Sequence, residues 1–268
     1  MQLKPVLTIA GSDSSGGAGI QADLKTMLAN GVFGMSAVTA LTAQNTQGVT
    51  DILEASPEFL KAEIDAVFSD IPPEAVKIGM VSSVPIIKAI AECLRKYKAK
   101  HVVEDPVMVA TSGAKLIADD AVEALTSELF PLAEVITPNL PELSVLCGHE
   151  INTAEEAVEA AKDIREKYGC AVLAKGGHAI GNADDYLVWD GGVKVFHAEH
   201  IPTKNTHGTG CTLSSAIAAN LAKGQALPYA VEKAKAYVTG AIAAGLELGH
   251  GNGPLAHGFD LTGKFIDA

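Results

Sequence analysis

The sequence predicts an α/β protein, a three-layer sandwich with a mainly parallel central sheet and helices on both faces. Short apolar segments bounded by turn residues alternate along the chain with longer segments of helical periodicity. Strand, crossover helix and strand in succession are typical of a parallel sheet. Polar or glycine-rich loops follow most of the apolar segments, and ligands bind at such loops in sheets of this kind.

The elements are expected in strict alternation over most of the chain. The expected strands are Pro5–Ala10, Ser36–Leu41, Ala75–Gly79, His101–Glu104, Glu134–Thr137 and Ala171–Lys175. The expected helices are Ile20–Leu28, Pro57–Val67, Val84–Tyr97, Asp119–Leu129 and Thr153–Tyr168. The segments Asp184–Trp189 and Lys194–His197 flank an Asp-Gly turn, which predicts a hairpin and an antiparallel edge. After Cys211 the chain is expected to be mostly helical through Leu248.

Composition limits the possible functions. No linker or repeat divides the chain, so residues 1–268 are expected to form a single domain. The net charge of −12 disfavours binding to nucleic acid or to an anionic membrane, because both need clustered Lys and Arg. We find no signal peptide or membrane span, and four dispersed cysteines make zinc and disulfides implausible. A soluble cytoplasmic protein is expected.

The most informative segment is Lys204–Thr212, a glycine-rich turn that leads into the apolar helix Leu213–Lys223. Gly208 and Gly210 allow the backbone to approach a ligand, and a helix N-terminus attracts anions. A helix N-terminus also lowers a thiol pKa, so Cys211 is a candidate base or nucleophile beside a bound phosphate. The alternative is a small buried Cys at an ordinary helix start.

The loop Gly11–Asp23 follows the first strand and contains Gly17-Ala18-Gly19-Ile20-Gln21-Ala22, a formal match to a dinucleotide-binding fingerprint. That fingerprint needs an acid about 20 residues further on, and residues 33–50 contain none. The loop also lacks the Gly-Lys-Ser/Thr of a P-loop. A small-molecule pocket lined by glycine backbone and Asp23 is the remaining interpretation, with a solvated surface Asp23 as the alternative.

Four further loops carry polar groups at strand ends. Residues 40–47 offer side-chain amides that suit a neutral heterocycle. Asp105 precedes a Thr/Ser/Gly segment, which is the arrangement expected of a metal-linked carboxylate under a flap. Asn139 and Glu142 form an N-x-x-E pattern, which is also a plain capping box. Lys175 precedes two glycines, as expected for a nucleotide phosphate.

Together these loops resemble the ribokinase-like vitamin kinases, and among them the hydroxymethylpyrimidine/phosphomethylpyrimidine kinases of thiamine biosynthesis. The resemblance runs from about Lys4 to about Gly251, with the motifs in the same order: Ala10–Lys25, Thr42–Val49, Asp105–Met108, Thr137–Glu142, Lys175–His178 and Asn205–Thr212. It implies a ribokinase-like sandwich without the separate β-lid of the sugar kinases. It also implies ATP- and Mg²⁺-dependent phosphorylation of 4-amino-5-hydroxymethyl-2-methylpyrimidine and then of its monophosphate, possible dimerisation, and small-molecule partners only.

The resemblance also implies a role for individual residues. Gly208, Thr209 and Gly210 would form an anion hole for the transferring phosphoryl group, and Cys211 would stand where related kinases place an Asp base. The residues implied in pyrimidine binding are Gly11, Asp23, Gln44, Met80 and Val107. Those implied in ATP binding are Asn139, Lys175, Gly177 and Lys235. Asp105 and Glu142 would hold Mg²⁺, largely through water, and His207 is expected to be a turn residue.

Two alternatives stay within the same fold. Pyridoxal-phosphorylating relatives carry a second Cys in the flap, whereas this flap has Ala110, so pyridoxine or pyridoxal kinase activity is the second hypothesis. A sugar kinase is disfavoured by Cys211 and by the missing lid. A non-catalytic nucleotide-binding domain is disfavoured because every expected phosphoryl-transfer element is present.

Overall fold

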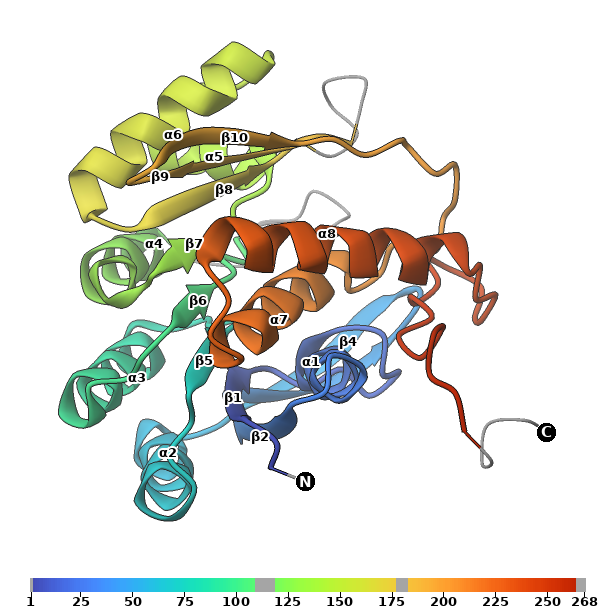
Figure 1. The fold of residues 1–268 in the computed structure, drawn as a ribbon. Helices are drawn as coiled ribbons and strands as arrows, with labels where there is room; N and C mark the ends of the chain where they lie inside the picture. Colours follow the sequence, from blue (N-terminus) through green and yellow to red (C-terminus); the bar gives the residue numbers. More distant parts are fainter. Residues whose placement is uncertain (1, 109–118, 177–182, 264–268) are drawn as a thin grey trace.

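The computed structural model in Figure 1 describes residues 2–108, 119–176 and 183–263. Its main sheet has eight strands in the order β10-β9-β8-β7-β6-β5-β1-β2. These strands are β1 (Pro5–Ala10), β2 (Phe33–Val38), β5 (Ala75–Ile78), β6 (Val102–Glu104), β7 (Val135–Ile136), β8 (Ala171–Lys175), β9 (Asp185–Trp189) and β10 (Gly192–Phe196). Pairing is parallel from β2 to β8, and β9 and β10 continue the sheet in antiparallel fashion. This arrangement confirms the predicted fold class, including the antiparallel edge.

Helices cover both faces of the sheet (Figure 1). One face packs against α1 (Gly19–Ala29), α7 (Thr209–Ala222) and α8 (Leu227–Ala243). The other packs against α2 (Pro57–Asp70), α3 (Val84–Tyr97), α4 (Asp119–Ala124), α5 (Leu140–Cys147) and α6 (Ala154–Tyr168). Each face has its own apolar core, because successive strand residues point to opposite sides. In β5, Val76 and Ile78 join one core and Ala75 joins the other.

The order of the strands places the functional region. From β1 the chain moves outward to β2 and then returns to the other side of β1 as β5. Ligands in open α/β sheets bind at such a reversal, outside the carboxyl ends of the strands. The loops that begin at Gly11 and Gly79 lie at these ends, together with the start of α7.

One local prediction was wrong. The single strand expected at Ser36–Leu41 is β2 followed by a separate hairpin of β3 (Ala40–Asn45) and β4 (Gly48–Glu54), where a loop was expected. All seven residues of β4 are exposed, so no burial pattern marked it in the sequence. The helix expected at Asp119–Leu129 is present over that range, as α4 up to Ala124 followed by a π-helical turn from Leu125 to Leu129.

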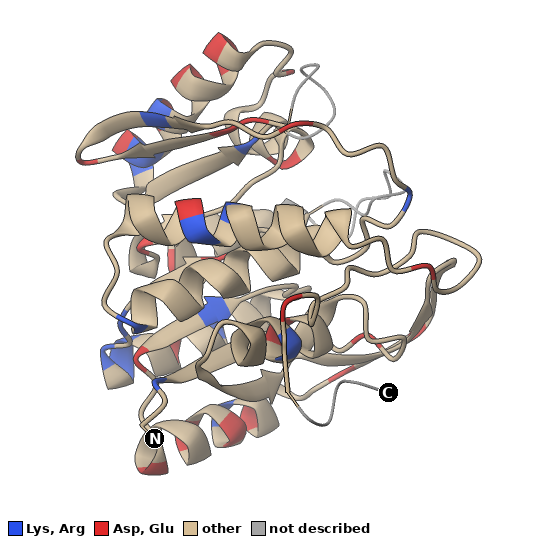
Figure 2. Ribbon diagram, turned by 45° about the vertical axis from the view of Figure 1, so that its right-hand side comes forward, with Lys and Arg blue, Asp and Glu red and all other residues tan. Residues whose placement is uncertain are grey.

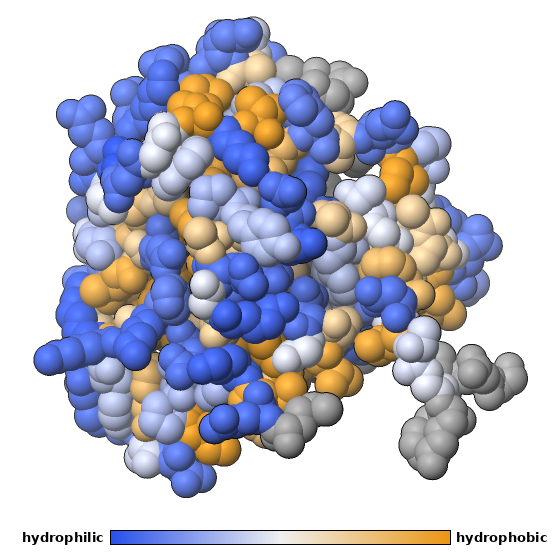
Figure 3. Space-filling view, viewed as in Figure 1, coloured by the Kyte–Doolittle hydropathy of each residue, from blue (hydrophilic) through white to orange (hydrophobic). Residues whose placement is uncertain are grey.

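Positions of Lys and Arg are interspersed with positions of Asp and Glu along the helices and loops in Figure 2. Figure 3 shows apolar side chains in small groups among polar ones on the face that carries α7 and α8. Within the described residues, no helix is both long enough and apolar enough to cross a membrane.

Candidate active site

The start of α7 has backbone geometry that suits an anion. Gly208 caps the helix with φ 85° and ψ 9°, a left-handed conformation that favours glycine. A Cβ at Gly208 would lie 1.9 Å from the carbonyl oxygen of Gly17, so the two glycine-rich loops touch at this point. The next N–H groups, those of Gly210 and Cys211, belong to the first helical turn, where intrahelical acceptors are missing. These groups and the helix dipole suit an anion such as phosphate.

Asp105 and Lys175 meet in front of this helix start. Lys175 Nζ donates to Oδ1 of Asp105 at 3.0 Å, and Thr137 Oγ1 donates to the same oxygen at 3.1 Å. A Cβ at Gly210 would lie 3.1 Å from Oδ2 of Asp105 and 3.5 Å from Lys175 Nζ. Three strand ends and the helix N-terminus therefore converge, as the sequence analysis expected of Asp105, Lys175 and the Gly208–Cys211 loop.

The two acids at this point differ in electrostatics. Burial would raise the pKa of Asp105, but Lys175 and Lys77 lower it below its usual value, so Asp105 is ionised. Burial raises the pKa of Glu142 to about 7, with Lys175 and hydrogen bonds from backbone N–H groups opposing the rise and Asp105 adding to it. Glu142 therefore carries a partial charge near neutral pH in the free protein.

Asn139 and Glu142 form the capping box that the sequence analysis named as the structural alternative. The Asn139 side chain accepts a hydrogen bond from the Glu142 N–H at 2.9 Å, and Oε2 of Glu142 accepts one from the Asn139 N–H at 2.8 Å. This reciprocal pair starts α5 and occupies one oxygen of Glu142. The other oxygen, Oε1, receives a long 3.4 Å hydrogen bond from the Met108 N–H.

Asp105 and Glu142 suit the usual coordination of a Mg²⁺ ion that binds together with a nucleotide. In the parts of the chain that the structure describes, no group of three or more His, Cys, Asp or Glu side chains could hold a metal ion. Mg²⁺ commonly takes one or two carboxylates and completes its shell with waters and phosphate oxygens. Thr137 and Lys175 both donate to Oδ1 of Asp105, and the capping box uses Oε2 of Glu142. The other oxygen of each carboxylate, Oδ2 of Asp105 and Oε1 of Glu142, is suited to an ion that is shared with phosphate.

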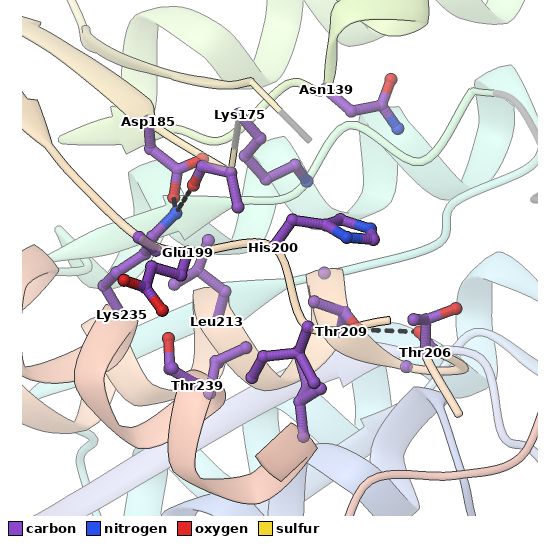
Figure 4. Close-up of a pocket in the computed structure, with 17 residues that line it drawn as sticks. Asn139, Lys175, Asp185, Glu199, His200, Thr206, Thr209, Leu213, Lys235 and Thr239 are labelled. Carbon is purple, nitrogen blue, oxygen red and sulfur yellow. Dashed lines mark hydrogen bonds and ion pairs between the residues drawn. The ribbon is translucent and has the colours of Figure 1, made fainter. Parts of the chain in front are cut away.

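A cavity of about 380 Å³ opens beside the helix start, between α7, α8 and the ends of β8 and β9 (Figure 4). Its walls are apolar at Leu213, Val238 and Ile242, and its polar groups include Asn139 and Lys175. This combination suits a flat apolar ring with a charged tail at the Lys175 end.

Lys235 also lines this cavity, as predicted, but its ammonium group is engaged. It donates to Oδ2 of Asp185 at 2.6 Å and to the carbonyl oxygen of Ala183 (Figure 4). Lys235 therefore forms part of the cavity wall as an ion pair and not as a free cation. Asp185 and the apolar residues of the wall are site residues that the sequence analysis missed.

On the other side of the helix start lie the residues expected to bind the heterocycle. A Cβ at Gly11 would lie 2.7 Å from Cε of Met80, so these two residues are in contact and a side chain at Gly11 would displace the end of Met80. Gln44 is half-buried, and its backbone is held by Ser14, whose hydroxyl donates to the Gln44 carbonyl at 2.7 Å. Val107 is half-buried in the turn that follows Asp105.

Comparison with known proteins decides the family. The sequence profile of the phosphomethylpyrimidine kinase family matches residues 13–256. The chain belongs to this family. It is 54% identical to the hydroxymethylpyrimidine/phosphomethylpyrimidine kinase of Rhizobium meliloti, over 94% of this chain and 96% of that protein. The enzyme of the same name from Escherichia coli is 46% identical, over 94% of this chain and 96% of that protein.

Solved structures of two kinds resemble this family member. The crystal structure of phosphomethylpyrimidine kinase from Clostridium difficile is 49% identical, with a TM-score of 0.81, and covers 89% of this chain and 99% of its own. An ADP complex of Bacillus subtilis pyridoxal kinase is 38% identical, with a TM-score of 0.89, covering 96% and 98%. The fold is thus shared by both kinds of kinase, and sequence identity is what separates them.

Asp23 does not reach the substrate side of this kinase. Its side chain is fully buried beneath α7, and its carboxylate accepts hydrogen bonds from Thr8 at 2.6 Å, Lys77 at 3.0 Å and Ser215 at 2.8 Å. Both oxygens are therefore used inside the protein. The prediction that Asp23 contacts the heterocycle is corrected to a supporting role under the site, and the solvated surface alternative is also wrong.

The electrostatics of Cys211 also correct the sequence analysis. Burial raises the pKa of the Cys211 thiol to about 11, and the carboxylates of Asp23 and Asp105 add to this effect. Lys77 and the Gly19 N–H act in the opposite direction but do not reverse it. The position at a helix N-terminus was correct, but the expected lowering of the pKa was not, because desolvation outweighs the helix.

Three further residues were missed by the sequence analysis or assigned no function. Lys77 is fully buried in β5 and pairs with Asp23; its position inside an apolar strand was the only available signal. Asp13 is buried in the first glycine-rich loop, and His207 Nε2 lies 2.8 Å from its Oδ2. His207 is thus more than a turn residue. The predicted ATP-binding Gly177 and the flap with Ala110 lie outside the described residues.

Proposed function

We propose that this protein transfers the γ-phosphoryl group of ATP to the hydroxymethyl group of 4-amino-5-hydroxymethyl-2-methylpyrimidine, and then phosphorylates the monophosphate. The single observation that supports this most is the position of the α7 N-terminus. It lies between the 380 Å³ cavity on one side and the loops of Gly11 and Gln44 on the other, with Asp105 and Lys175 in front. A phosphoryl group held there faces a donor and an acceptor site.

The nucleotide would occupy the cavity. Its base would pack against Leu213, Val238 and Ile242, and its phosphates would lie toward Lys175 and the first turn of α7. Phosphoryl transfer needs positioning and charge neutralisation more than covalent chemistry. A helix N-terminus and a half-buried Lys supply both in a site with little water.

Asp105 and Glu142 would hold Mg²⁺, which neutralises phosphate charge when bound. Asp105 is ionised in the free protein, and Lys175 and Thr137 fix its orientation. Because both acids are buried, a cation shared with the nucleotide would offset the cost of their burial. Metal affinity is therefore expected to depend strongly on the presence of nucleotide.

Cys211 would receive the proton of the substrate hydroxyl. With a pKa of about 11, most of the thiol is protonated at neutral pH in the free protein. In a loose transition state the hydroxyl loses its proton late, when P–O bond formation has made it acidic. Only the thiolate form can take this proton, so turnover would use the minor thiolate fraction, and the α7 amides would carry the rest of the stabilisation.

The test is turnover of purified protein with ATP and Mg²⁺, offering the pyrimidine alcohol, its monophosphate, pyridoxal or ribose in turn. Of these compounds, the pyrimidine alcohol and its monophosphate are expected to have the highest kcat/KM. The second candidate, pyridoxal kinase, is favoured by the TM-score of 0.89 to pyridoxal kinases. Efficient turnover of pyridoxal without pyrimidine phosphate would establish that candidate instead. A cytoplasmic location, where ATP is available, fits either activity.

We also propose that two copies of this chain associate through the β3–β4 hairpin. Leu41 and Leu53 are cross-strand partners with 54% and 69% of their surface exposed. An isolated two-stranded ribbon is marginally stable, so a symmetric second copy that covers these leucines would stabilise it. Light scattering should find a dimer at micromolar concentration, and Leu53→Glu should convert it to a monomer. A monomeric unmodified protein would contradict this arrangement.

A further inference from the structure

His207 joins three segments that are distant in the sequence. Its Nε2 lies 2.8 Å from Oδ2 of Asp13 in the first glycine-rich loop and 3.4 Å from the side-chain amide of Gln44 at the end of β3. A Cβ at Gly17 would lie 2.6 Å from the His207 ring, so the ring packs directly on that backbone. The next residue in the chain is Gly208, the cap of the anion site.

The Asp13 carboxylate determines which ring nitrogen of His207 carries hydrogen. Burial would raise the pKa of Asp13, but hydrogen bonds from His207, Ser15 and the Ala18 N–H hold it below its usual range. Oδ2 also accepts from the N–H groups of Gly17 at 3.1 Å and Ala18 at 2.8 Å. An ionised carboxylate is an acceptor only, so Nε2 of His207 must be a donor.

Thr42 determines which end of the Gln44 amide faces it. Its hydroxyl lies 2.8 Å from the Ser12 carbonyl oxygen and 3.1 Å from the Gln44 amide atom placed as Oε1, with the atom placed as Nε2 toward His207. A hydroxyl has a single hydrogen, and the Ser12 carbonyl, which can only accept, takes it at the shorter distance. Toward Gln44 the Thr42 oxygen is therefore an acceptor, which requires the amide nitrogen.

The same orientation follows from the other end of the amide. If the amide nitrogen faced His207, two donors would meet at 3.4 Å. With the oxygen toward His207, it lies beside the Nε2–H group that Asp13 holds, as the longer branch of a shared hydrogen bond, and with the nitrogen toward Thr42 the amide donates to the hydroxyl oxygen. Amide oxygen and nitrogen have nearly the same shape, so hydrogen-bond partners decide between them. Two neighbours independently select one orientation.

We propose that His207, held by Asp13, is a specificity-determining residue that acts by fixing the orientation of the Gln44 amide. This inference rests on the proposed function, in which Gln44 contacts the pyrimidine. In the fixed orientation, the oxygen of Gln44 retains one lone pair for the 4-amino group and the nitrogen retains one hydrogen for ring N3. The order of groups along the substrate agrees with this orientation. The 4-amino group is next to the carbon that bears the hydroxymethyl group, and His207, which faces the amide oxygen, is next to Gly208 in the chain.

A fixed amide discriminates between two substrate classes, whereas a free one does not. The 4-oxo analogue, 5-hydroxymethyl-2-methylpyrimidin-4-one, carries a hydrogen on N3 and an acceptor at C4, the reverse of the 4-amino compound. A Gln side chain that rotates freely by 180° can pair with either compound. With His207 and Thr42 in place, the oxo compound would face two mismatched contacts, and unsatisfied buried polar groups are costly.

The test is the ratio of kcat/KM for the 4-amino substrate to that for the 4-oxo analogue. We expect His207→Leu, which has no donor, to lower this preference by roughly 10-fold or more, since a mismatched buried hydrogen bond typically costs about 1–3 kcal/mol. His207→Gln restores an N–H donor and should retain most of the preference. Thr42→Val should also lower it, whereas Thr42→Ser, which keeps the hydroxyl, should not. His250→Leu, at an exposed histidine, is the matched control and should leave the ratio unchanged.

Equal losses on both substrates in His207→Leu and Thr42→Val, with the preference intact, would overturn the inference and leave His207 a loop-packing residue. Equal activity of the unmodified enzyme on both compounds would overturn it as well. If the unmodified enzyme phosphorylated neither pyrimidine, the proposed function would fail instead, and the two failures are thereby distinguished. Thermal unfolding of each variant shows whether the fold is retained, and the Thr42 pair serves as the test where His207→Leu does not fold.

Discussion

The protonation of Cys211 can be measured directly by alkylation. With a thiol pKa of about 11, the thiolate fraction at pH 7 is about 10⁻⁴, and it increases tenfold with each pH unit up to that value. The rate of reaction with iodoacetamide should therefore rise about 100-fold between pH 7 and pH 9, because only the thiolate reacts. The experiment uses Cys147→Ala, since Cys147 is a partly exposed thiol whereas Cys93 and Cys170 are buried. Cys147→Ala/Cys211→Ala gives the background.

A rate that levels off below pH 9 would refute this reasoning. It would mean that the α7 N-terminus lowers the thiol pKa more than burial raises it. Circular dichroism at each pH ensures that the protein remains folded. If the thiolate is the general base, kcat/KM for the pyrimidine should rise in parallel with alkylation, and Cys211→Ala should lower kcat by roughly 10²–10⁴. A flat kinetic profile with the same loss in Cys211→Ala would show that the thiolate is not the base and that Cys211 contributes in another way.

Three further predictions concern Gln44, the buried ion pair and Glu104. Gln44→Ala should raise the KM for the pyrimidine by a factor equivalent to about 1–3 kcal/mol and leave the KM for ATP nearly unchanged; equal effects in steady-state kinetics would contradict substrate contact. Asp23→Leu should destabilise the fold by about 3–5 kcal/mol in urea unfolding, because Lys77 loses its partner. Asp23→Leu/Lys77→Met should recover most of that loss, and equal stability of the single and double variants would count against the pair. Burial and the charge of Asp105 raise the pKa of Glu104. Above about pH 4 the folded state therefore keeps a proton that the unfolded state loses, and the stability of the fold decreases as the pH rises. Glu104→Gln removes this dependence, so its stability relative to the unmodified protein should increase by up to about 1.4 kcal/mol per pH unit between pH 5 and 7; a constant difference would show that Glu104 is already ionised in the folded state in this range.

Local sequence patterns were sufficient to find the loops and strand ends that form the candidate site. The glycines of the α7 start, the Asn139–Glu142 cap and the strand-end residues Asp105 and Lys175 are each marked by neighbours within a few positions. Strand ends of a parallel sheet share one edge, so finding each loop also predicts that the loops converge. The structure confirms this convergence with a 3.0 Å contact between Lys175 and Asp105.

Side-chain roles could not be predicted in the same way, because they depend on partners far along the chain. Asp23 pairs with Lys77, 54 positions away, and with Ser215, 192 positions away. Asp13 and His207 are 194 positions apart. No periodicity or motif brings such partners together. The β3–β4 hairpin was missed for a different reason, since all of β4 is exposed and the buried residues of β3, Ala40 and Thr42, are not large apolar residues that would mark an alternation.

The three aspartates around the site show why burial must be known before a carboxylate is given a role. All three are buried, yet their donors differ. Asp13 is surrounded by N–H groups and a histidine that it orients, and Asp23 neutralises a lysine beneath the catalytic helix. Asp105 has both of its described donors on one oxygen, which leaves the other toward Gly210 and the proposed phosphoryl site. Of the three, Asp105 is thus the carboxylate suited to a metal and its phosphate, and the other two act through the groups that they hold.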